Sequence, residues 1–426
     1  MRNIILAGLW LLVAVGGLSP SSSAAAPAAA PPAGRWVASW GASPLSRATL
    51  SPGTKLPESF ANQTLRQRVR LSLGGSQLRL RLSNEFGSAP IVIGAASVGL
   101  AGTGAAIEPG SLRTVTFGGS TSIVIPAGAP AESDPIDLRV DDLAELNVSL
   151  FLPEQTRADT LHSFEDRPAW IADGGDGTAQ LDFTAPATAL ARFFLTRIDV
   201  LAGPAARTVV AFGDSITEGG KADSGWPSAF ARRLAASSST RGQIGVLNAG
   251  ISGNRLREDG IGPSALARFD RDVLAIPGVT HVVVLEGIND LGFFGLTGTP
   301  LHIPSKIDAQ DLIAAYQQLI ARAHLRGIRI IGSTLTPFAG FTWLAGYYTP
   351  AKDRIREQVN RWIRTSGAFD AVIDFEATMR DPADPDRLSA KVDWGDHLHP
   401  SDAGMGIMAD AVDLDLLGIG ARQPRN

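Results

Sequence analysis

Residue types suited to acyl transfer stand directly after apolar runs in the second half of the chain. In chain order these residues are Gly213, Asp214, Ser215, Gly250, Gly253, Gly287, Asn289 and Asp290. The later stretch DWGDHLHPSDAG adds acids and histidines. Acyl transfer needs a nucleophile, donors for an oxyanion and an acid–histidine pair, and this set contains candidates for all three.

Five apolar runs in this half alternate with helical segments. The runs are 208–212, 244–249, 280–286, 328–335 and 371–375, and the helical segments are about 226–237, 263–275, 308–326, 351–364 and 401–417. Continuous apolar strands that alternate with helices predict βαβ units, with a parallel sheet covered on both faces. Ligands bind beyond the carboxyl ends of such strands, which is where the polar residues stand.

The region from Trp36 to Val200 shows short strands and turns instead. In LRQRVRLSLGGSQLRLRLSNEFG, apolar and polar residues alternate on both sides of Gly74-Gly75, which predicts a hairpin with one buried face. TSIVIPAG, LNVSLFLP and RFFLTRIDVL repeat the strand pattern, so we expect an antiparallel β-sandwich or jelly roll. Five arginines are expected on its solvated face, with a ligand-binding stripe as the alternative: Arg66, Arg68, Arg70, Arg79 and Arg81.

Four short blocks of the second half resemble those of the GDSL/SGNH hydrolases. They are Gly213-Asp214-Ser215-Ile216, Ser252-Gly253-Asn254, Gly287-Ile288-Asn289-Asp290 and Asp396-His397-Leu398-His399. Each block is weak alone, but four in order at strand ends, within about 205–420, form a specific pattern. The opening RWVASWGASP also resembles the start of secreted two-domain members. The resemblance implies an α/β fold, a flavodoxin-like three-layer α/β/α domain with a parallel sheet, and ester hydrolysis by a serine enzyme.

The resemblance also implies a role for each matched residue. Ser215 is the nucleophile, His399 the base, and Asp396 the acid that orients the imidazole. The backbone N–H groups of Ser215 and Gly253 and the side chain of Asn289 hold the oxyanion. Elementary chemistry agrees, because a serine hydroxyl needs an imidazole to take its proton, and the imidazolium needs a carboxylate. Glycine leaves a backbone donor accessible, and an amide donates without carrying a charge.

The loop residues each have a structural alternative. Ser215 could cap the helix that follows it, and Gly253 could simply turn the chain. Asn289 and Asp290 could form an Asx turn after their strand. We expect a catalytic role for Asn289 and a structural one for Asp290.

The acid–histidine loop contains competing partners. His397 competes with His399, and Asp393 competes with Asp396, but the Asp-x-x-His spacing favours Asp396 and His399. Asp396, His397 and His399 could instead bind a metal ion. Neither a His-Glu-x-x-His motif nor another histidine cluster supplies the further ligands, so we expect no metal and no cofactor.

The N-terminal segment has the pattern of an export signal. Arg2 precedes an apolar stretch of about 15 residues, shorter than the ~20 needed to span a bilayer, and small residues follow up to Ala26. We therefore expect a signal peptide at 1–26, an Ala/Pro tether at 27–34, a β domain at 35–203 and a catalytic domain at 204–426. The mature protein is expected to be secreted, extracellular or periplasmic, without a stable membrane anchor.

The amino-acid composition excludes some classes of partner and of catalytic chemistry. A net charge of −4, with no basic run, argues against nucleic acid, and the absence of cysteine excludes thiol catalysis and disulfides. The expected substrates are small-molecule or polysaccharide esters, first of all acetyl esters of carbohydrates or glycosides. A lipase or arylesterase acting on longer acyl or aryl esters is the alternative. A non-catalytic secreted carbohydrate-binding protein is the alternative from another class. The oligomeric state is left open.

Overall fold

The computed structural model describes residues 34–51, 53–163, 167–220, 225–296, 299, 301, 303 and 306–418. The predicted signal peptide and all but the last residue of the tether lie outside the described residues. Contacts between Cα atoms gather Gly34–Asn426 into one compact unit. Its predicted β part and catalytic part are called the N-terminal half and the C-terminal half below.

The N-terminal half is built mostly of antiparallel strands, as predicted. One sheet has the order β15 (Ala187–Ala189), β14 (Ala169–Asp173), β4 (Gln63–Arg70), β11 (Glu145–Leu152), β7 (Ala95–Leu100) and β8 (Arg113–Thr114). A second has the order β1 (Arg35–Gly41), β17 (Leu195–Ala202), β5 (Leu78–Ser83) and β10 (Pro130–Glu132). Both sheets contribute to one hydrophobic core, which includes Leu65, Val148, Leu80 and Ile198.

Smaller sheets complete this half. They are β16 (Ala191–Phe193), β13 (Thr160–Ser163) and β2 (Leu45–Ser46); β12 (Thr156–Arg157) and β3 (Ser59–Phe60); and β6 (Ile91–Ile93) and β9 (Ile123–Ile125). A single 3₁₀ turn, Arg47–Thr49, follows β2.

The predicted hairpin at Gly74-Gly75 is wrong. Its leucines are buried as expected, but β4 pairs with β11 and β14, whereas β5 pairs with β10 and β17. The turn therefore carries the chain from one sheet to the other. Alternation of apolar residues reports which side chains are buried, but it does not identify the strand that accepts the hydrogen bonds.

The prediction that Arg66 lies on the solvated face of the sheet is wrong, because this side chain is fully buried. Its guanidinium donates to Ser149 Oγ at 2.9 Å, to the Ala105 carbonyl at 2.9 Å and to the Gln180 carbonyl at 2.7 Å. Burial lowers its pKa to about 10. Carbonyl oxygens from two loops replace its water shell, so this arginine fixes loops that cross the sheet.

The C-terminal half contains the predicted parallel sheet. Its strands are β18 (Arg207–Gly213), β19 (Ile244–Gly250), β20 (Val279–Leu285), β21 (Arg329–Ser333) and β22 (Ala371–Ile373), in the spatial order β19-β18-β20-β21-β22. All neighbours are parallel. This is the 2-1-3-4-5 order of flavodoxin-like folds, in which ligands bind at the carboxyl ends beside the first strand.

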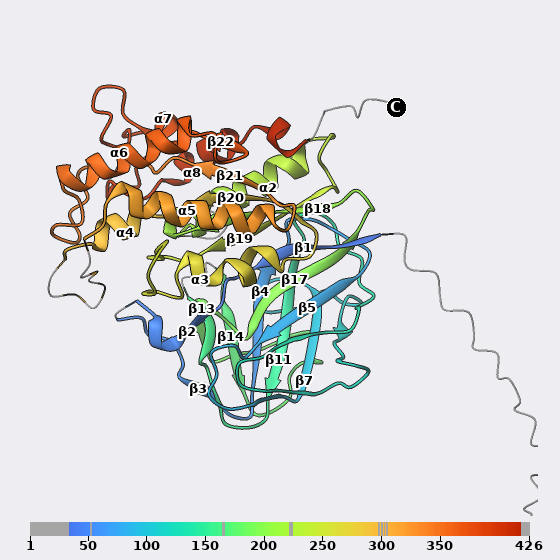
Figure 1. The fold of residues 1–426 in the computed structure, drawn as a ribbon. Helices are drawn as coiled ribbons and strands as arrows, with labels where there is room; N and C mark the ends of the chain where they lie inside the picture. Colours follow the sequence, from blue (N-terminus) through green and yellow to red (C-terminus); the bar gives the residue numbers. More distant parts are fainter. Residues whose placement is uncertain are drawn as a thin grey trace, which may run out of the picture. The chain divides into compact units, whose positions relative to one another are not determined.

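Helices cover this sheet. They are α1 (Ser215–Glu218), α2 (Trp226–Ala236), α3 (Ala265–Phe269), α4 (Ile288–Phe293), α5 (Ala309–His324), α6 (Pro350–Thr365), α7 (Phe375–Met379) and α8 (Asp402–Asp410). A π-helical turn, Asp270–Leu274, extends α3, and a 3₁₀ turn, Leu414–Leu417, ends the described chain. The longest, α5, begins with a capping box between Asp308 and Asp311. Figure 1 shows α5 crossing in front of the sheet.

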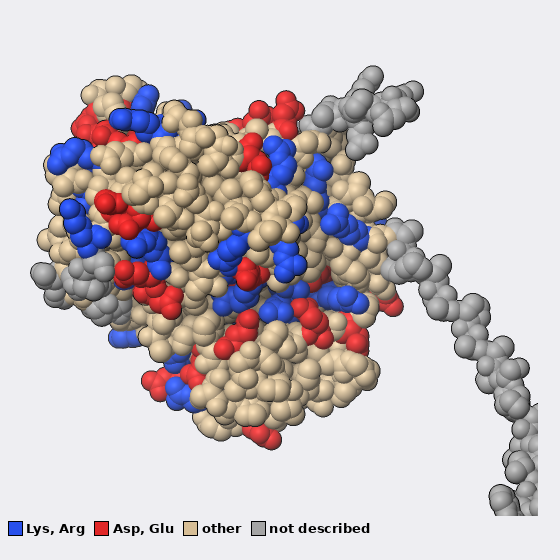
Figure 2. All heavy atoms as spheres, viewed as in Figure 1, with Lys and Arg blue, Asp and Glu red and all other residues tan. Residues whose placement is uncertain are grey.

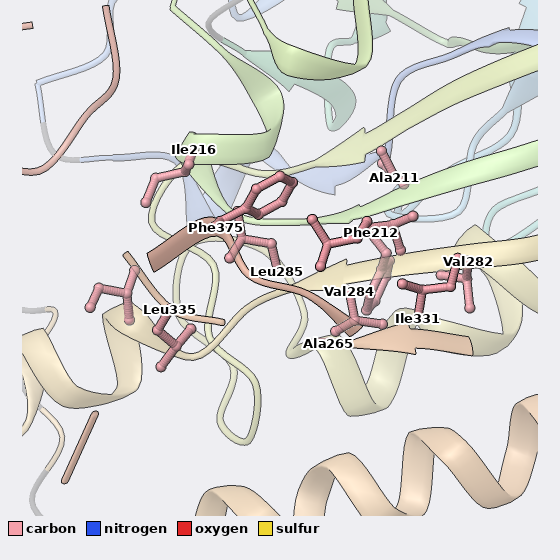
Figure 3. Close-up of a cluster of buried hydrophobic side chains, with 14 of the residues drawn as sticks. Ala211, Phe212, Ile216, Ala265, Val282, Val284, Leu285, Ile331, Leu335 and Phe375 are labelled. Carbon is pink, nitrogen blue, oxygen red and sulfur yellow. The ribbon is translucent and has the colours of Figure 1, made fainter. Parts of the chain in front are cut away.

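The core of the C-terminal half lies along β18 and β20. Figure 3 shows Phe212, Val282, Val284 and Leu285 of these strands gathered in one buried cluster with Phe375. These side chains are 0–1% exposed. Because the strands are buried on both faces, their sequences are continuously apolar rather than alternating.

The two halves are bonded to each other at the outer strand β19 and at its neighbour β18. Ser72 Oγ accepts from Val246 N at 2.9 Å, and Thr208 Oγ1 donates to the Ala38 carbonyl at 3.1 Å. Ile251 and Ile261, which belong to the loop after β19, are part of the N-terminal core. The catalytic sheet is therefore held by packing as well as by hydrogen bonds against the N-terminal half.

Two further observations concern the distribution of charge on the surface and the length of the apolar helices. On the face drawn in Figure 2, acidic and basic side chains are intermixed. Within the described part of the chain, no helix combines the length and the apolar character needed to cross a bilayer.

Candidate active site

Ser215 lies where β18 ends and α1 begins. Asp214 is the N-cap of α1, and its carboxylate accepts from Ile216 N at 2.9 Å. Gly213 is required just before this turn, since a Cβ there would lie 2.2 Å from the Leu285 carbonyl oxygen. Asp214, rather than Ser215, therefore provides the cap. The hydroxyl of Ser215 is 2.8 Å from Nε2 of His399.

Asp396 and His399 form the predicted pair. Nδ1 of His399 donates to Oδ2 of Asp396 at 2.5 Å, which leaves Nε2 as the acceptor for Ser215. Oδ1 of Asp396 accepts from the backbone N–H groups of Leu398 and His399, at 3.0 and 2.8 Å. Burial acts to raise the pKa of Asp396, but its bond to His399, the charge of that imidazole and the two N–H groups leave this pKa below its ordinary value.

Gly253 and Asn289 lie on the wall of the same cavity as Ser215 and His399. Gly253 has φ +76°, and a Cβ there would lie 2.4 Å from Cδ1 of Ile261, so the position favours glycine on both counts. No hydrogen bond to its N–H is found among the described residues. This N–H is thus available to a ligand.

Asn289 presents an unused donor. Tyr347 donates its hydroxyl proton to Oδ1 of Asn289 at 2.8 Å, which fixes the orientation of the amide. Nδ2 is buried and has no hydrogen-bond partner within the described structure. A buried donor without a partner is rare in proteins, and at a cavity wall it indicates a site for an external acceptor. Tyr347 was missed by the motif analysis because it comes from a distant loop.

The competing residues form a second pair. Nδ1 of His397 is 2.6 Å from Oδ2 of Asp393, and Oδ1 of Asp393 accepts from His397 N at 3.0 Å. Neither residue lines the cavity with Ser215. Since each histidine bonds to its own acid, the structure does not bring Asp396, His397 and His399 together as metal ligands. In the described ranges, the one cluster with metal-binding spacing is Asp353, Glu357 and Asp386.

The buried side chain of Arg268 connects the three loops of the site. Its guanidinium donates to the carbonyl oxygens of Gly213 at 2.8 Å and Ala249 at 2.7 Å, and to Oδ1 of Asn254 at 2.9 Å. It also lies 3.5 Å from Oε2 of Glu286. These partners stand at the ends of β18, β19 and β20, so one buried side chain sets the spacing of the loops.

Three buried acids stand close to the ends of β18 and β20. Burial raises the pKa of Asp214 to about 7 and that of Asp290 to about 6. Burial and the charge of Asp214 raise the pKa of Glu286 well above its ordinary value. Asp290 accepts from the N–H groups of Leu256 at 2.6 Å and Arg257 at 3.1 Å, contacts that tie the loop after β20 to the loop after β19.

A further bridge comes from the N-terminal half. Nδ1 of His162 is 2.7 Å from the Ser43 carbonyl, and Nε2 is 2.7 Å from Oε1 of Glu218. The other carboxylate oxygen of Glu218 accepts from Ser252 Oγ, next to Gly253. Both ring nitrogens of His162 lie within hydrogen-bonding distance of these oxygen atoms, so the ring links the N-terminal half to α1. No sequence motif pointed to this contact.

The cavity is large and mostly apolar. Its volume is about 830 Å³. Two aromatic stretches, 293–294 and 338–348, contribute Phe293, Phe341, Trp343 and Tyr347 to its lining. Trp226, which follows the loop of Ser215, is buried in the core. Trp343 and Trp394 stand at the rim, with ring centroids 6.4 Å apart.

No curated protein matches the chain in sequence. Solved structures that resemble it include a GDSL-like lipase from Bacteroides thetaiotaomicron, with 20% identity over 50% of this chain and 88% of that chain and a TM-score of 0.38. An acetylxylan esterase from Geobacillus stearothermophilus has 24% identity over 51% of this chain and 95% of that one, with a TM-score of 0.38.

The model of one protein family, described as the GDSL-like lipase/acylhydrolase family, matches residues 211–407. The match begins in β18, just before Ser215, and ends in α8, so it spans all four sequence blocks. The resemblance inferred from these blocks is therefore confirmed for the C-terminal half. Residues 211–407 form a GDSL-like lipase/acylhydrolase domain, and the protein is an ester hydrolase.

Proposed function

We propose that the protein hydrolyses carboxylic esters through an acyl-enzyme on Ser215, with His399 and Asp396 completing a catalytic triad. The observation that carries the proposal is the continuous hydrogen-bonded chain from Asp396 through His399 to Ser215, at 2.5 and 2.8 Å. It ends in a cavity where Nδ2 of Asn289 has no partner among the described residues. A structural helix cap would need none of these contacts.

The reaction follows from the positions of the protons. Nε2 of His399 takes the hydroxyl proton as Ser215 Oγ bonds to the ester carbonyl carbon. The carbonyl oxygen becomes an oxyanion, which the N–H groups of Ser215 and Gly253 and Nδ2 of Asn289 stabilise. His399 then gives the proton to the leaving alcohol oxygen. Water, deprotonated by the same nitrogen, hydrolyses the acyl-enzyme and restores Ser215.

Two ester classes were predicted, and the cavity favours the second. A volume of about 830 Å³ suits a bulky ligand, whereas an acetyl group would occupy only a small part of it. The preference therefore goes to longer acyl or aryl esters over acetylated carbohydrate. Export to the extracellular or periplasmic space belongs to the same proposal, and rests on the sequence pattern of residues 1–26.

The test uses p-nitrophenyl butyrate with matched variants. Ser215→Ala and His399→Ala should each lower kcat by up to about a millionfold, as expected for members of a triad that act as a unit. His397→Ala, a histidine in the same loop that pairs with Asp393, should stay within about threefold of the parent because it lies outside the cavity. An equal loss in both histidine variants, or unchanged activity of Ser215→Ala, would contradict the proposal.

A further inference from the structure

The N-terminal half contributes part of the cavity wall. The cavity that contains Ser215 and His399 is also lined by residues of this half, both apolar (among them Leu56, Pro57 and Leu190) and polar (Ser51, Thr54, Lys55, Ser163 and Thr188). Leu56 and Pro57 belong to the segment before β3, and Leu190 lies between β15 and β16. None of them belongs to the segment that matches the hydrolase family, residues 211–407. This wall is thus a feature that the family domain alone does not provide.

The apolar part of this wall is formed by Leu56, Pro57, Ala189 and Leu190. Leu190 is 56% exposed, one of few large apolar side chains with so much accessible surface in the described structure. The charged residues among the described lining are Lys55 and Asp402. The four apolar residues offer hydrocarbon contacts, which suit an apolar acyl chain. An exposed leucine at a cavity wall gains free energy when a ligand removes it from water.

The wall is fixed with respect to the oxyanion donors. Leu56 and Leu301 pack against the N-terminal core, and this core also contains Ile251 and Ile261 of the loop that carries Gly253. Gly253 itself lies against Ile261. The loop that holds the reacting carbonyl and the wall that meets the rest of the ester are therefore parts of one packed body, so the distance between them is set by the fold.

We propose that Leu190 and Leu56 of the N-terminal half are specificity residues that select esters with an apolar acyl chain of about eight carbons over acetyl esters. This inference rests on the proposed function, because it assigns the substrate of the same site. Each buried methylene favours binding by about fourfold, so six additional methylenes give an upper limit of about four thousandfold in kcat/KM. Partial contact of the acyl chain with the wall should still raise kcat/KM for the octanoyl ester at least about tenfold over that for the acetyl ester.

The experiment compares p-nitrophenyl acetate and octanoate, both below the concentration at which the octanoate aggregates. Leu190→Asp places a charge in the wall and should lower kcat/KM for the octanoate at least about tenfold, with the acetate within about twofold. Leu190→Ala should give a smaller loss of the same selectivity. Val124→Asp is the matched control, since Val124 is 59% exposed in the same half and does not line the cavity. It should change neither rate.

The outcomes separate the two proposals. A parent enzyme that prefers the acetate, or a Leu190→Asp variant that loses both activities equally while its melting temperature is unchanged, overturns the assignment of this wall and leaves the triad standing. Hydrolysis that survives Ser215→Ala for both esters removes the proposed function itself. Selective loss of the octanoate activity in Leu190→Asp, without loss in Val124→Asp, establishes the role of the N-terminal half in substrate choice.

Discussion

The unpaired amide of Asn289 allows a sharp prediction about the oxyanion site. In the resting protein Nδ2 has no partner among the described residues, so truncation to alanine removes only the bond from Tyr347, worth about 1 kcal/mol of stability. The transition state loses much more, because one oxyanion donor is typically worth about 3–4 kcal/mol. Asn289→Ala should therefore lower kcat by about a hundred- to a thousandfold and change KM little, since the bond forms only as the charge develops.

Tyr347 provides an independent check on this reasoning. Its hydroxyl fixes the amide of Asn289, so Tyr347→Phe leaves the donor in place but free to turn. We expect a fall in kcat of about five- to tenfold, comparable to the loss of one neutral hydrogen bond. If Tyr347 acts through Asn289, the double variant should be no slower than Asn289→Ala alone. Tyr348→Phe is the control, because Tyr348 packs on Phe338 and does not line the cavity.

The assay is steady-state hydrolysis of p-nitrophenyl butyrate by the four variants, together with urea unfolding. Losses that multiply in the double variant would show that Tyr347 contacts the substrate rather than the amide. A fall of less than about fivefold in kcat for Asn289→Ala, or an increase confined to KM, would refute the assignment of Asn289 as an oxyanion donor.

Three further changes test the support of the site. His162→Gln breaks the contact with Glu218 and should lower kcat for the butyrate ester about tenfold, at unchanged KM, because a hydrogen bond that positions the loop of Gly253 is lost. Arg268→Met removes the buried cation that donates to Asp272 and to the Gly213 carbonyl, and should cost about 3–5 kcal/mol in urea unfolding; a cost below about 1 kcal/mol would contradict its role. Burial raises the pKa of Asp214 to about 7, so the folded state keeps a proton that the unfolded state releases, and the free energy of unfolding should fall as the pH rises from about 4 to about 7. Asp214→Asn retains an oxygen for the helix cap and should reduce this slope, measured by urea unfolding at a series of pH values; an unchanged slope would show that Asp214 does not titrate in this range.

The parallel sheet and the positions of the site residues were predictable from the sequence for a physical reason. A strand buried on both faces must be continuously apolar, so its end is visible where the polar residues begin, as at Gly213 and Asn289. Parallel strands place their carboxyl ends at one edge, which brings residues distant in sequence together without knowledge of side-chain packing. The resemblance of the four blocks then implied that Ser215 and His399, 184 positions apart, are partners.

The wrong predictions concern long-range contacts that leave no local pattern. Whether β4 pairs with β5 or with β11 depends on turns and packing elsewhere in the N-terminal half, and both arrangements bury the same leucines. Arg66 could not be recognised as buried, because its partners are carbonyl oxygens, which every residue possesses. The same limit applies to Tyr347 and Arg268, whose types are common and whose partners lie in other loops.

The N-terminal half and the catalytic loops depend on each other through shared packing. The loop after β19 holds Gly253 at φ +76°. Ile251 and Ile261, on either side of Gly253, are buried in the core of the N-terminal half, so this core helps to fix the position of the proposed oxyanion donor. His162 adds a hydrogen-bonding contact to the same region through Glu218. A change in the N-terminal half can therefore alter catalysis in two separate ways: through the apolar wall that receives the acyl chain, and through the position of the donor that stabilises the oxyanion. The first would alter the ratio of rates between two esters, and the second would lower both rates together.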